Sequence, residues 1–269
     1  MTLLSVHHLH FAYPGRSVLH DLNFSLPAGQ LIGIVGPNGS GKSTLLKLLA
    51  RQQHPSQGQI RLADRPLQSY GNKELARRLA YLPQRPQLPA GIRVDQLVQY
   101  GRYPHQGWLR QWSHEDQQQV LKARDQLQLQ DLWLQPAGSL SGGQAQRAWL
   151  GMIVAQDSDL VLLDEPTSAL DIGHQADVLE SIHQMTRGGK TVLMVIHDLA
   201  AAARYCDQLL ALADGRQQAF GPAREVVTKP LIERLYGTEV DLLAAPQDGA
   251  PVIVPRRRHP RSPPSSSLF

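Results

Sequence analysis

The chain has 269 residues, of which 42% are hydrophobic, and carries a formal net charge of +4 at pH 7. This length is enough for one large globular domain or two small ones. Its apolar runs are far shorter than the roughly 18–20 residues of a membrane-spanning helix. The N-terminus has neither the basic stretch nor the apolar core of a signal peptide. The single cysteine, Cys206, excludes an internal disulfide and suits a reducing compartment. We therefore expect a soluble, cytoplasmic protein.

The positive charge is concentrated at the C-terminus. Residues 256–269 contain four arginines and no acidic residue, and these arginines equal the whole net charge of +4. Because the segment is also rich in proline and serine, we expect a disordered basic tail that the protein can lose. The rest of the chain has no excess of basic residues, so we do not expect a nucleic-acid partner.

The hydrophobic pattern predicts an α/β fold. Two sets of alternating apolar residues near the N-terminus predict short antiparallel strands: Leu4, Val6 and Leu9, then Val18, Leu22, Phe24 and Leu26. A buried strand at 31–35 precedes a glycine-rich loop and a helix with leucines at 45–49. From about residue 90 to 156 the pattern is helical, with a helix start at Ser113 and Asp116. Strands are then expected at 160–163, 192–196 and 209–212, alternating with helices at 176–185 and 199–205. This alternation is typical of a parallel sheet covered by helices.

The glycine-rich loop has the pattern G-x-x-x-x-G-K-[ST]. It reads Gly36-Pro37-Asn38-Gly39-Ser40-Gly41-Lys42-Ser43-Thr44 and stands between a predicted strand and a predicted helix. Glycines at these positions allow backbone N–H groups to converge on phosphate oxygens at the helix start. Lys42 is then expected to reach the β- and γ-phosphates, and Ser43 to bind Mg²⁺. The loop predicts a P-loop nucleotide-binding site.

Two acidic residues, Asp164 and Glu165, follow the predicted strand at 160–163. A residue at the carboxyl end of a parallel strand faces the crevice in which such sheets bind ligands. Asp164 is therefore predicted to hold Mg²⁺ or its water, and Glu165 to accept a proton from the attacking water. The alternative, a solvated acidic turn, is less favoured beside a P-loop.

A second glycine-containing stretch, Leu140-Ser141-Gly142-Gly143-Gln144, opens another predicted helix. It has no lysine, but Ser141 and the following amides at a helix start can bind phosphate. This stretch resembles the signature motif of the ABC (ATP-binding cassette) transporter family. Other motifs match in order and spacing: Tyr13 resembles the adenine-stacking aromatic, Gln84 the Q-loop glutamine, Asp171 the D-loop aspartate and His197 the switch histidine. The resemblance runs from about Leu4 to Pro255.

The resemblance implies an ATPase domain over residues 1–255 that uses ATP and Mg²⁺. Its expected fold is a RecA-like P-loop NTPase core with a parallel sheet, an antiparallel β subdomain and an inserted helical subdomain at about 86–157. In the family two copies pair head to tail, so each ATP lies between one P-loop and the partner's signature motif. The implied split site takes Lys42, Ser43, Gln84, Asp164, Glu165 and His197 from one copy and Ser141 and Gly143 from the other, with Gln84 also near the metal. The family usually has a basic residue after the signature glutamine, whereas this chain has Ala145. The effect of this difference on the rate of turnover does not follow from the sequence.

Four further stretches resemble the ATPases of ferric siderophore importers: Tyr100–Gln106, Arg147–Trp149, Asp171–Gln175 and Pro251–Pro255. This resemblance implies a peripheral subunit on the cytoplasmic face of the inner membrane. Its expected partners are two permease subunits and, indirectly, a substrate-binding protein. Cobalamin or haem import remains an alternative, and export through separate permeases a weaker one. Non-transport ABC ATPases are disfavoured because only 56 positions separate Gln84 from Leu140 and one cysteine cannot build a zinc site.

Overall fold

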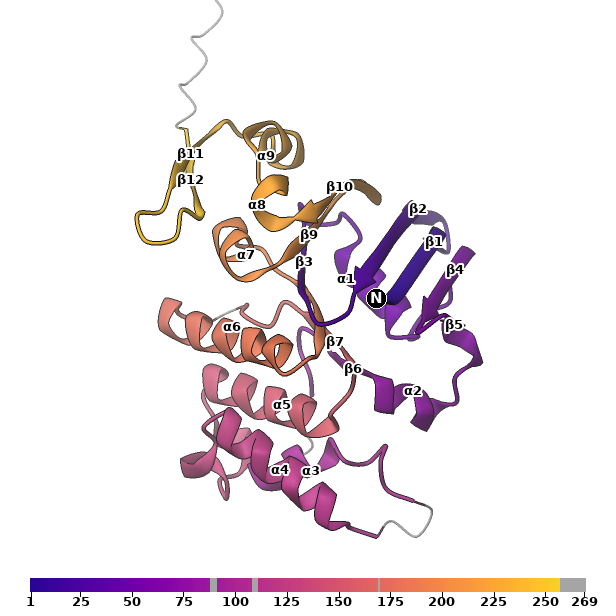
Figure 1. The fold of residues 1–269 in the computed structure, drawn as a ribbon, viewed down its shortest axis with the longest axis vertical. Coiled ribbons are helices and arrows are strands. Elements are labelled where there is room, and N and C mark those ends of the chain that lie inside the picture. The colour runs from indigo at the N-terminus through magenta and orange to yellow at the C-terminus, as the bar shows by residue number, and fades with distance from the viewer. Residues whose placement is uncertain (88–90, 108–110, 169, 257–269) are drawn as a thin grey trace, which may run out of the picture.

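The computed structural model describes residues 1–87, 91–107, 111–168 and 170–256. Its centre is a six-stranded sheet of order β10-β9-β3-β8-β7-β6 (Figure 1). The strands are β3 (Leu31–Val35), β6 (Leu79–Leu82), β7 (Leu160–Asp164), β8 (Thr191–Val195), β9 (Gln208–Ala213) and β10 (Arg216–Pro222). All are parallel except β10, which pairs antiparallel with β9. The predicted α/β fold with a helix-covered parallel sheet is confirmed.

The two faces of this sheet carry separate hydrophobic cores. Alternate residues of β3 divide between them, with Ile32 and Ile34 in one core and Leu31 and Val35 in the other. Helix α1 (Lys42–Leu49) packs in the first core, while α6 (Ile172–Arg187) and α7 (Leu199–Tyr205) pack in the second. Burial on both faces explains why the parallel strands are continuous apolar runs.

The N-terminal strands belong to an antiparallel sheet of order β2-β1-β4-β5. Its strands are β1 (Thr2–Tyr13), β2 (Arg16–Pro27), β4 (Gln57–Leu62) and β5 (Arg65–Pro66). The expectation of short strands is wrong, because β1 and β2 have 12 residues each. A register shift between Val6 and Leu9, with a φ of 47° at His8, inserts a bulge that returns Leu9 to the buried face. The bulge breaks the alternation but not the strand.

Three helices form a layer at one end of the molecule (Figure 1). They are α3 (Val94–Tyr100), α4 (His114–Gln126) and α5 (Gly142–Gln156), with short 3₁₀ turns at Gln130–Leu132 and Ala137–Ser139. The predicted start of α4 is confirmed, because the Asp116 amide donates to Ser113 Oγ at 3.1 Å and the Ser113 amide donates to Asp116 Oδ2 at 3.0 Å. Helix α2 (Asn72–Arg78), preceded by a 3₁₀ turn at Leu67–Ser69, joins the antiparallel sheet to β6.

The chain ends in α8 (Ala223–Val226), α9 (Lys229–Tyr236) and a hairpin of β11 (Val240–Ala244) and β12 (Pro251–Pro255). Arg256, the first residue of the expected tail, instead belongs to this fold. Its amide donates to Glu239 O at 2.9 Å, and its guanidinium contacts both carboxylate oxygens of Asp241 at 2.6 and 2.9 Å. The remaining tail residues, 257–269, lie outside the described part of the chain.

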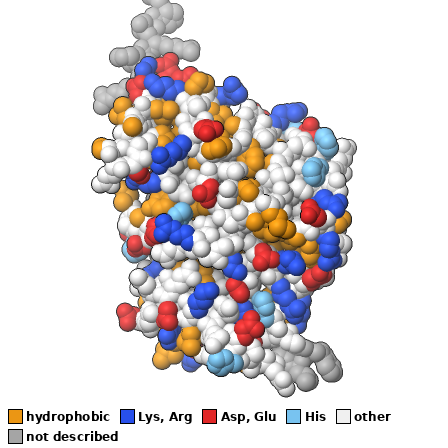
Figure 2. Space-filling view, in the orientation of Figure 1, with side chains coloured by type: hydrophobic (Ala, Val, Ile, Leu, Met, Phe, Trp, Pro, Cys, Tyr) orange, Lys and Arg blue, Asp and Glu red, His pale blue; other side chains and the backbone are white. Residues whose placement is uncertain are grey.

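Basic and acidic side chains are interspersed over much of the face shown in Figure 2, and apolar side chains gather toward the C-terminal hairpin. Leu243, Val252 and Val254 of that hairpin are exposed. Among the described residues, none of the helices has the length and apolar character needed to cross a membrane.

Candidate nucleotide-binding site

The P-loop wraps around the N-terminal end of α1. Two of its glycines adopt backbone conformations that residues with a Cβ rarely adopt. Gly36 has a φ of 146° and Gly41 a φ of 99°. A Cβ on Gly36 would collide with the carbonyl oxygen of Leu212, and one on Gly41 with the Leu19 side chain. The loop is therefore wrapped tightly between β3, β9 and the N-terminal hairpin, with its backbone amides at the helix start.

Lys42 occupies the first turn of α1 and is only 5% exposed. Its Nζ donates to the carbonyl oxygens of Gly36 at 2.8 Å and Pro37 at 2.9 Å. Burial lowers the pKa of Lys42, and the nearby carboxylates of Glu165 and Asp164 partly offset this effect. The ammonium of Lys42 is thus held inside the loop. A small movement of this side chain would exchange its carbonyl partners for phosphate oxygens.

Ser43 and Asp164 bring a hydroxyl and a carboxylate together across the sheet. Ser43 Oγ donates to Asp164 Oδ1 at 3.0 Å, although the residues are 121 positions apart. Asp164, at the carboxyl end of β7, is 5% exposed. Burial raises the pKa of Asp164, and the hydrogen bond from Ser43 opposes that rise. Two hard oxygen donors at this separation are suitable ligands for a divalent cation.

The Glu165 carboxylate contacts side chains that follow the two neighbouring strands, β8 and β6. His197, which follows β8, places Nε2 2.6 Å from Glu165 Oε1, and Gln84, which follows β6, donates from Nε2 to Glu165 Oε2. Glu165 itself has a left-handed backbone, with a φ of 53°. Such a conformation in a non-glycine residue is found where function or packing demands it. The Glu165 side chain lines the same cavity as Lys42 and Ser43 of the P-loop.

Lys42, Ser43 and Glu165 line one cavity of about 620 Å³, a volume suited to a nucleotide-sized ligand, and Asp164 lies behind its wall, hydrogen-bonded to Ser43. The lining comprises Tyr13, Arg16, Val18, Asn38, Gly39, Gly41, Lys42, Ser43, Thr44, Gln84, Glu165 and His197. Tyr13 reaches it from the β1–β2 hairpin, where its ring meets that of Phe11 edge to face, with centroids 4.8 Å apart. Arg16 and Val18 were not identified from the sequence. Their only signal was proximity to Tyr13 in the same hairpin.

The signature stretch and Asp171 do not line this cavity. Ser141 caps α5, since the Gln144 amide donates to Ser141 Oγ at 3.4 Å and the Ser141 amide to Gln144 Oε1 at 3.0 Å. A Cβ on Gly143 would touch the His174 ring, whose Nδ1 lies 2.8 Å from Asp171 Oδ2. The signature stretch and Asp171 therefore adjoin each other on a second surface of the same chain.

Asp164→Asn is expected to raise the melting temperature in the absence of divalent cations. Because the folded-state pKa of Asp164 is raised, its ionised form costs folding free energy above that pKa, and the cost vanishes as the pH falls through it. Asparagine carries no charge and retains an oxygen for Ser43. We expect a gain of about 1 kcal/mol at neutral pH, or roughly 2–4 °C, shrinking in acid. Calorimetry across pH tests this, and a lower melting temperature at neutral pH would contradict it.

A phosphate-binding loop between a buried strand and a helix, with two carboxylates at the carboxyl end of another parallel strand of the same sheet, defines a P-loop nucleoside triphosphatase. A family model described as "ABC transporter" matches residues 19–168. The chain belongs to the ABC transporter family, and it is an ATP-binding, ATP-hydrolysing subunit coupled to transport.

Curated relatives cover almost the whole chain. The ferric enterobactin transport ATP-binding protein FepC of Escherichia coli is 43% identical over 93% of this chain and 93% of its own length. The probable siderophore transport system ATP-binding protein YusV of Bacillus subtilis is 40% identical over 96% of this chain and 94% of its own length.

A solved metal-chelate type ABC transporter in an inward-facing conformation superposes on this chain with a TM-score of 0.83 at 29% identity. The match covers 96% of this chain and 99% of that one. A hemin import ATP-binding protein, HmuV of Pseudomonas putida, is 39% identical over 94% of this chain and 100% of its own length.

Proposed function

We propose that this chain hydrolyses ATP to drive the import of a ferric siderophore. The observation that carries the proposal is the cavity lined by the P-loop and by Glu165, whose carboxylate contacts both His197 and Gln84. The buried Asp164 adjoins this cavity through its hydrogen bond with Ser43 of the P-loop. Support for the cargo comes from relatives named for siderophore transport over nearly their full length. Hemin import relatives of similar identity support the second candidate cargo, haem.

Mg²⁺ is the cation that suits the donors in the cavity. Ser43 and Asp164 would hold it, and Gln84, at the end of the adjacent strand, would present its carbonyl oxygen to the metal or its water. When bound, the cation neutralises charge on the phosphate oxygens. Lys42 would leave the carbonyls of Gly36 and Pro37 to bind the β- and γ-phosphates, while Tyr13 would stack on the base.

Glu165 is proposed as the general base for the attacking water. His197 and Gln84 fix both of its carboxylate oxygens, so its position is set before the nucleotide arrives. The γ-phosphate would displace Gln84 and His197 toward its own oxygens, freeing the carboxylate to take a proton from water. The segment that follows Gln84 is proposed to dock against the permeases, so loss of the γ-phosphate contact at Gln84 would be transmitted to them.

Two copies of the chain are proposed to pair head to tail. Ser141 through Gln144 and Asp171 lie outside the cavity on a second surface, where they are available to bind a partner's nucleotide. The assembly would sit on two permease subunits at the cytoplasmic face of the inner membrane, with a substrate-binding protein acting indirectly. The ATPase domain would extend one residue past the expected boundary at 255, to Arg256, with about 86–157 as the helical subdomain.

Loss of this chain is expected to abolish growth only when iron is scarce and one ferric siderophore is its source. Uptake of radiolabelled ferric siderophore should fall to background in the deletion strain. The wild-type gene should restore it, and Lys42→Ala should not. Normal uptake of every siderophore, with haem or cobalamin uptake lost instead, would assign the chain to that other cargo.

A further inference from the structure

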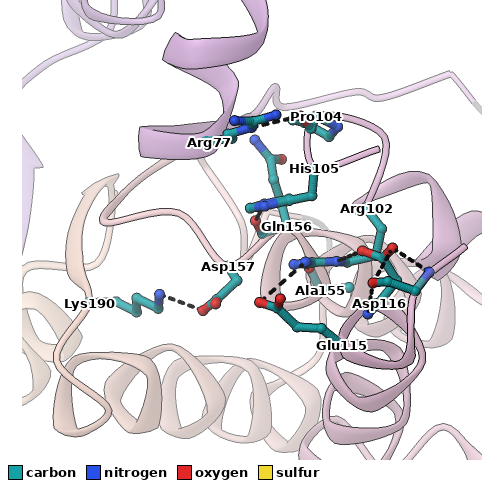
Figure 3. A network of polar contacts seen from close by, with 11 residues as sticks. Arg77, Arg102, Pro104, His105, Glu115, Asp116, Ala155, Gln156, Asp157 and Lys190 are labelled. Atoms are coloured by element: carbon teal, nitrogen blue, oxygen red, sulfur yellow. Dashed lines mark hydrogen bonds and ion pairs between the residues drawn. The ribbon is translucent and has the colours of Figure 1, made fainter. Parts of the chain in front are cut away.

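The segment Gly101–Gln106 lies between the C-terminal end of α5 and helix α2 (Figure 3). Gly101 runs so close to α5 that a Cβ there would collide with the Met152 carbonyl oxygen. Arg102 NH1 donates to Ala155 O at 2.9 Å, and His105 Nε2 lies 2.8 Å from Gln156 O and must donate to it. These two donors satisfy carbonyls of the last helical turn, which have no partner inside a helix.

Arg102 anchors the segment to a second helix. It is 1% exposed, and its Nε donates at 2.8 Å to Asp116, whose side chain is 4% exposed. Asp116 in turn caps α4 through the amide and hydroxyl of Ser113. A buried, hydrogen-bonded ion pair is costly to break, since the remaining charge would be left without a partner. The segment therefore moves with α4 and α5 as one unit.

On its other side the segment is bound to α2. Arg77 Nε donates to Pro104 O at 2.9 Å, and Lys73 Nζ donates to Gln106 O at 3.1 Å. Gln156, the last residue of α5, makes the same connection directly. Its Nε2 donates to Ala76 O at 2.7 Å and to Leu79 O at 3.2 Å, at the junction of α2 and β6. Strand β6 then leads within two residues to Gln84.

We propose that Gly101–Gln106 and Gln156 form a latch that positions the signature motif relative to Gln84. The latch holds one end of α5 against the α2–β6 junction, and Ser141 caps the opposite end. A helix of 15 residues is about 22 Å long, so a tilt of roughly 5° at the latch displaces Ser141 by about 2 Å. Misplacement of this size is enough to lower catalysis about 10²-fold. The latch rests on the roles proposed for Ser141 and Gln84.

No latch residue lines the cavity, so the chain's own ATP binding does not depend on the latch. His105 and Gln156 are therefore positioning residues. Their loss should lower the rate of ATP hydrolysis without weakening ATP binding by the monomer. In the double variant His105→Ala/Gln156→Ala, kcat for ATP hydrolysis falls about 10–100-fold while the Kd of the monomer for ATP changes less than about twofold. ATP-driven dimerisation of the same variant weakens in parallel.

The matched control is His114→Ala, an exposed histidine at the start of α4, which leaves kcat unchanged. His105→Gln, whose amide can still donate to Gln156 O, restores most of the activity lost in His105→Ala. If the double variant has a lower melting temperature than the wild-type chain, the same two measurements are made on the single His105→Ala variant. Wild-type kcat in these variants, or an equal loss of monomer ATP binding, overturns the latch. The proposed function fails separately, by undiminished hydrolysis in Glu165→Gln.

Discussion

Glu165→Gln is expected to bind ATP and to hydrolyse it about 10²–10⁴-fold more slowly than the wild-type chain, the usual cost of removing a general base. This corresponds to roughly 3–5 kcal/mol of activation free energy. Glutamine has the same shape as glutamate and its amide oxygen can keep the contact to His197, but the amide cannot accept the proton of the attacking water. Single-turnover phosphate release measures the loss. Unhydrolysed nucleotide should also trap a stable dimer, which gel filtration detects.

Glu233→Gln provides the matched control. Glu233 is an exposed glutamate on α9, outside the cavity lining, so the same chemical change there should leave turnover intact. Turnover of Glu165→Gln within about threefold of wild type would exclude Glu165 as the general base.

Ser141→Arg and Lys42→Ala are expected to fail at different steps. Lys42 lies in the chain's own cavity, so its loss should weaken ATP binding by a monomer about 10–100-fold, the value of a charged phosphate contact. Ser141 lies outside the cavity, so Ser141→Arg should leave monomer binding almost intact and lower hydrolysis by about 10²-fold or more, because an arginine would block the partner's phosphates. Equilibrium ATP binding under monomeric conditions and steady-state hydrolysis separate the two.

A mixture of the two variants should contain dimers with at most one working site. Ser141→Ala, which removes the hydroxyl without adding bulk, should lie between wild type and Ser141→Arg in hydrolysis. If Ser141→Arg lost monomer ATP binding as completely as Lys42→Ala, the head-to-tail arrangement would be wrong.

Local sequence patterns were sufficient for the P-loop and for the acidic strand end. Gly36 and Gly41 need backbone angles or close approaches that only glycine accepts, and Asp164 ends an apolar run that is buried on both faces. These features depend on a few consecutive residues, so the pattern and the conformation are directly connected. Continuous apolar runs also identified the parallel strands β3, β7, β8 and β9, because burial on two faces leaves few polar positions within them. The remaining parallel strand, β6, is a run of only four residues and was not predicted.

Long-range contacts depended on the order of strands in the sheet. Gln84, Glu165 and His197 meet because β6, β7 and β8 are neighbours, although Gln84 and Glu165 are 81 positions apart. Arg16 enters the cavity because the β1–β2 hairpin packs beside the P-loop. Arg102, a residue type expected at the surface, is buried because Asp116 of helix α4 neutralises it. In each case the position and burial of a side chain depend on partners that the fold brings from distant parts of the chain. No local sequence pattern encodes these partners.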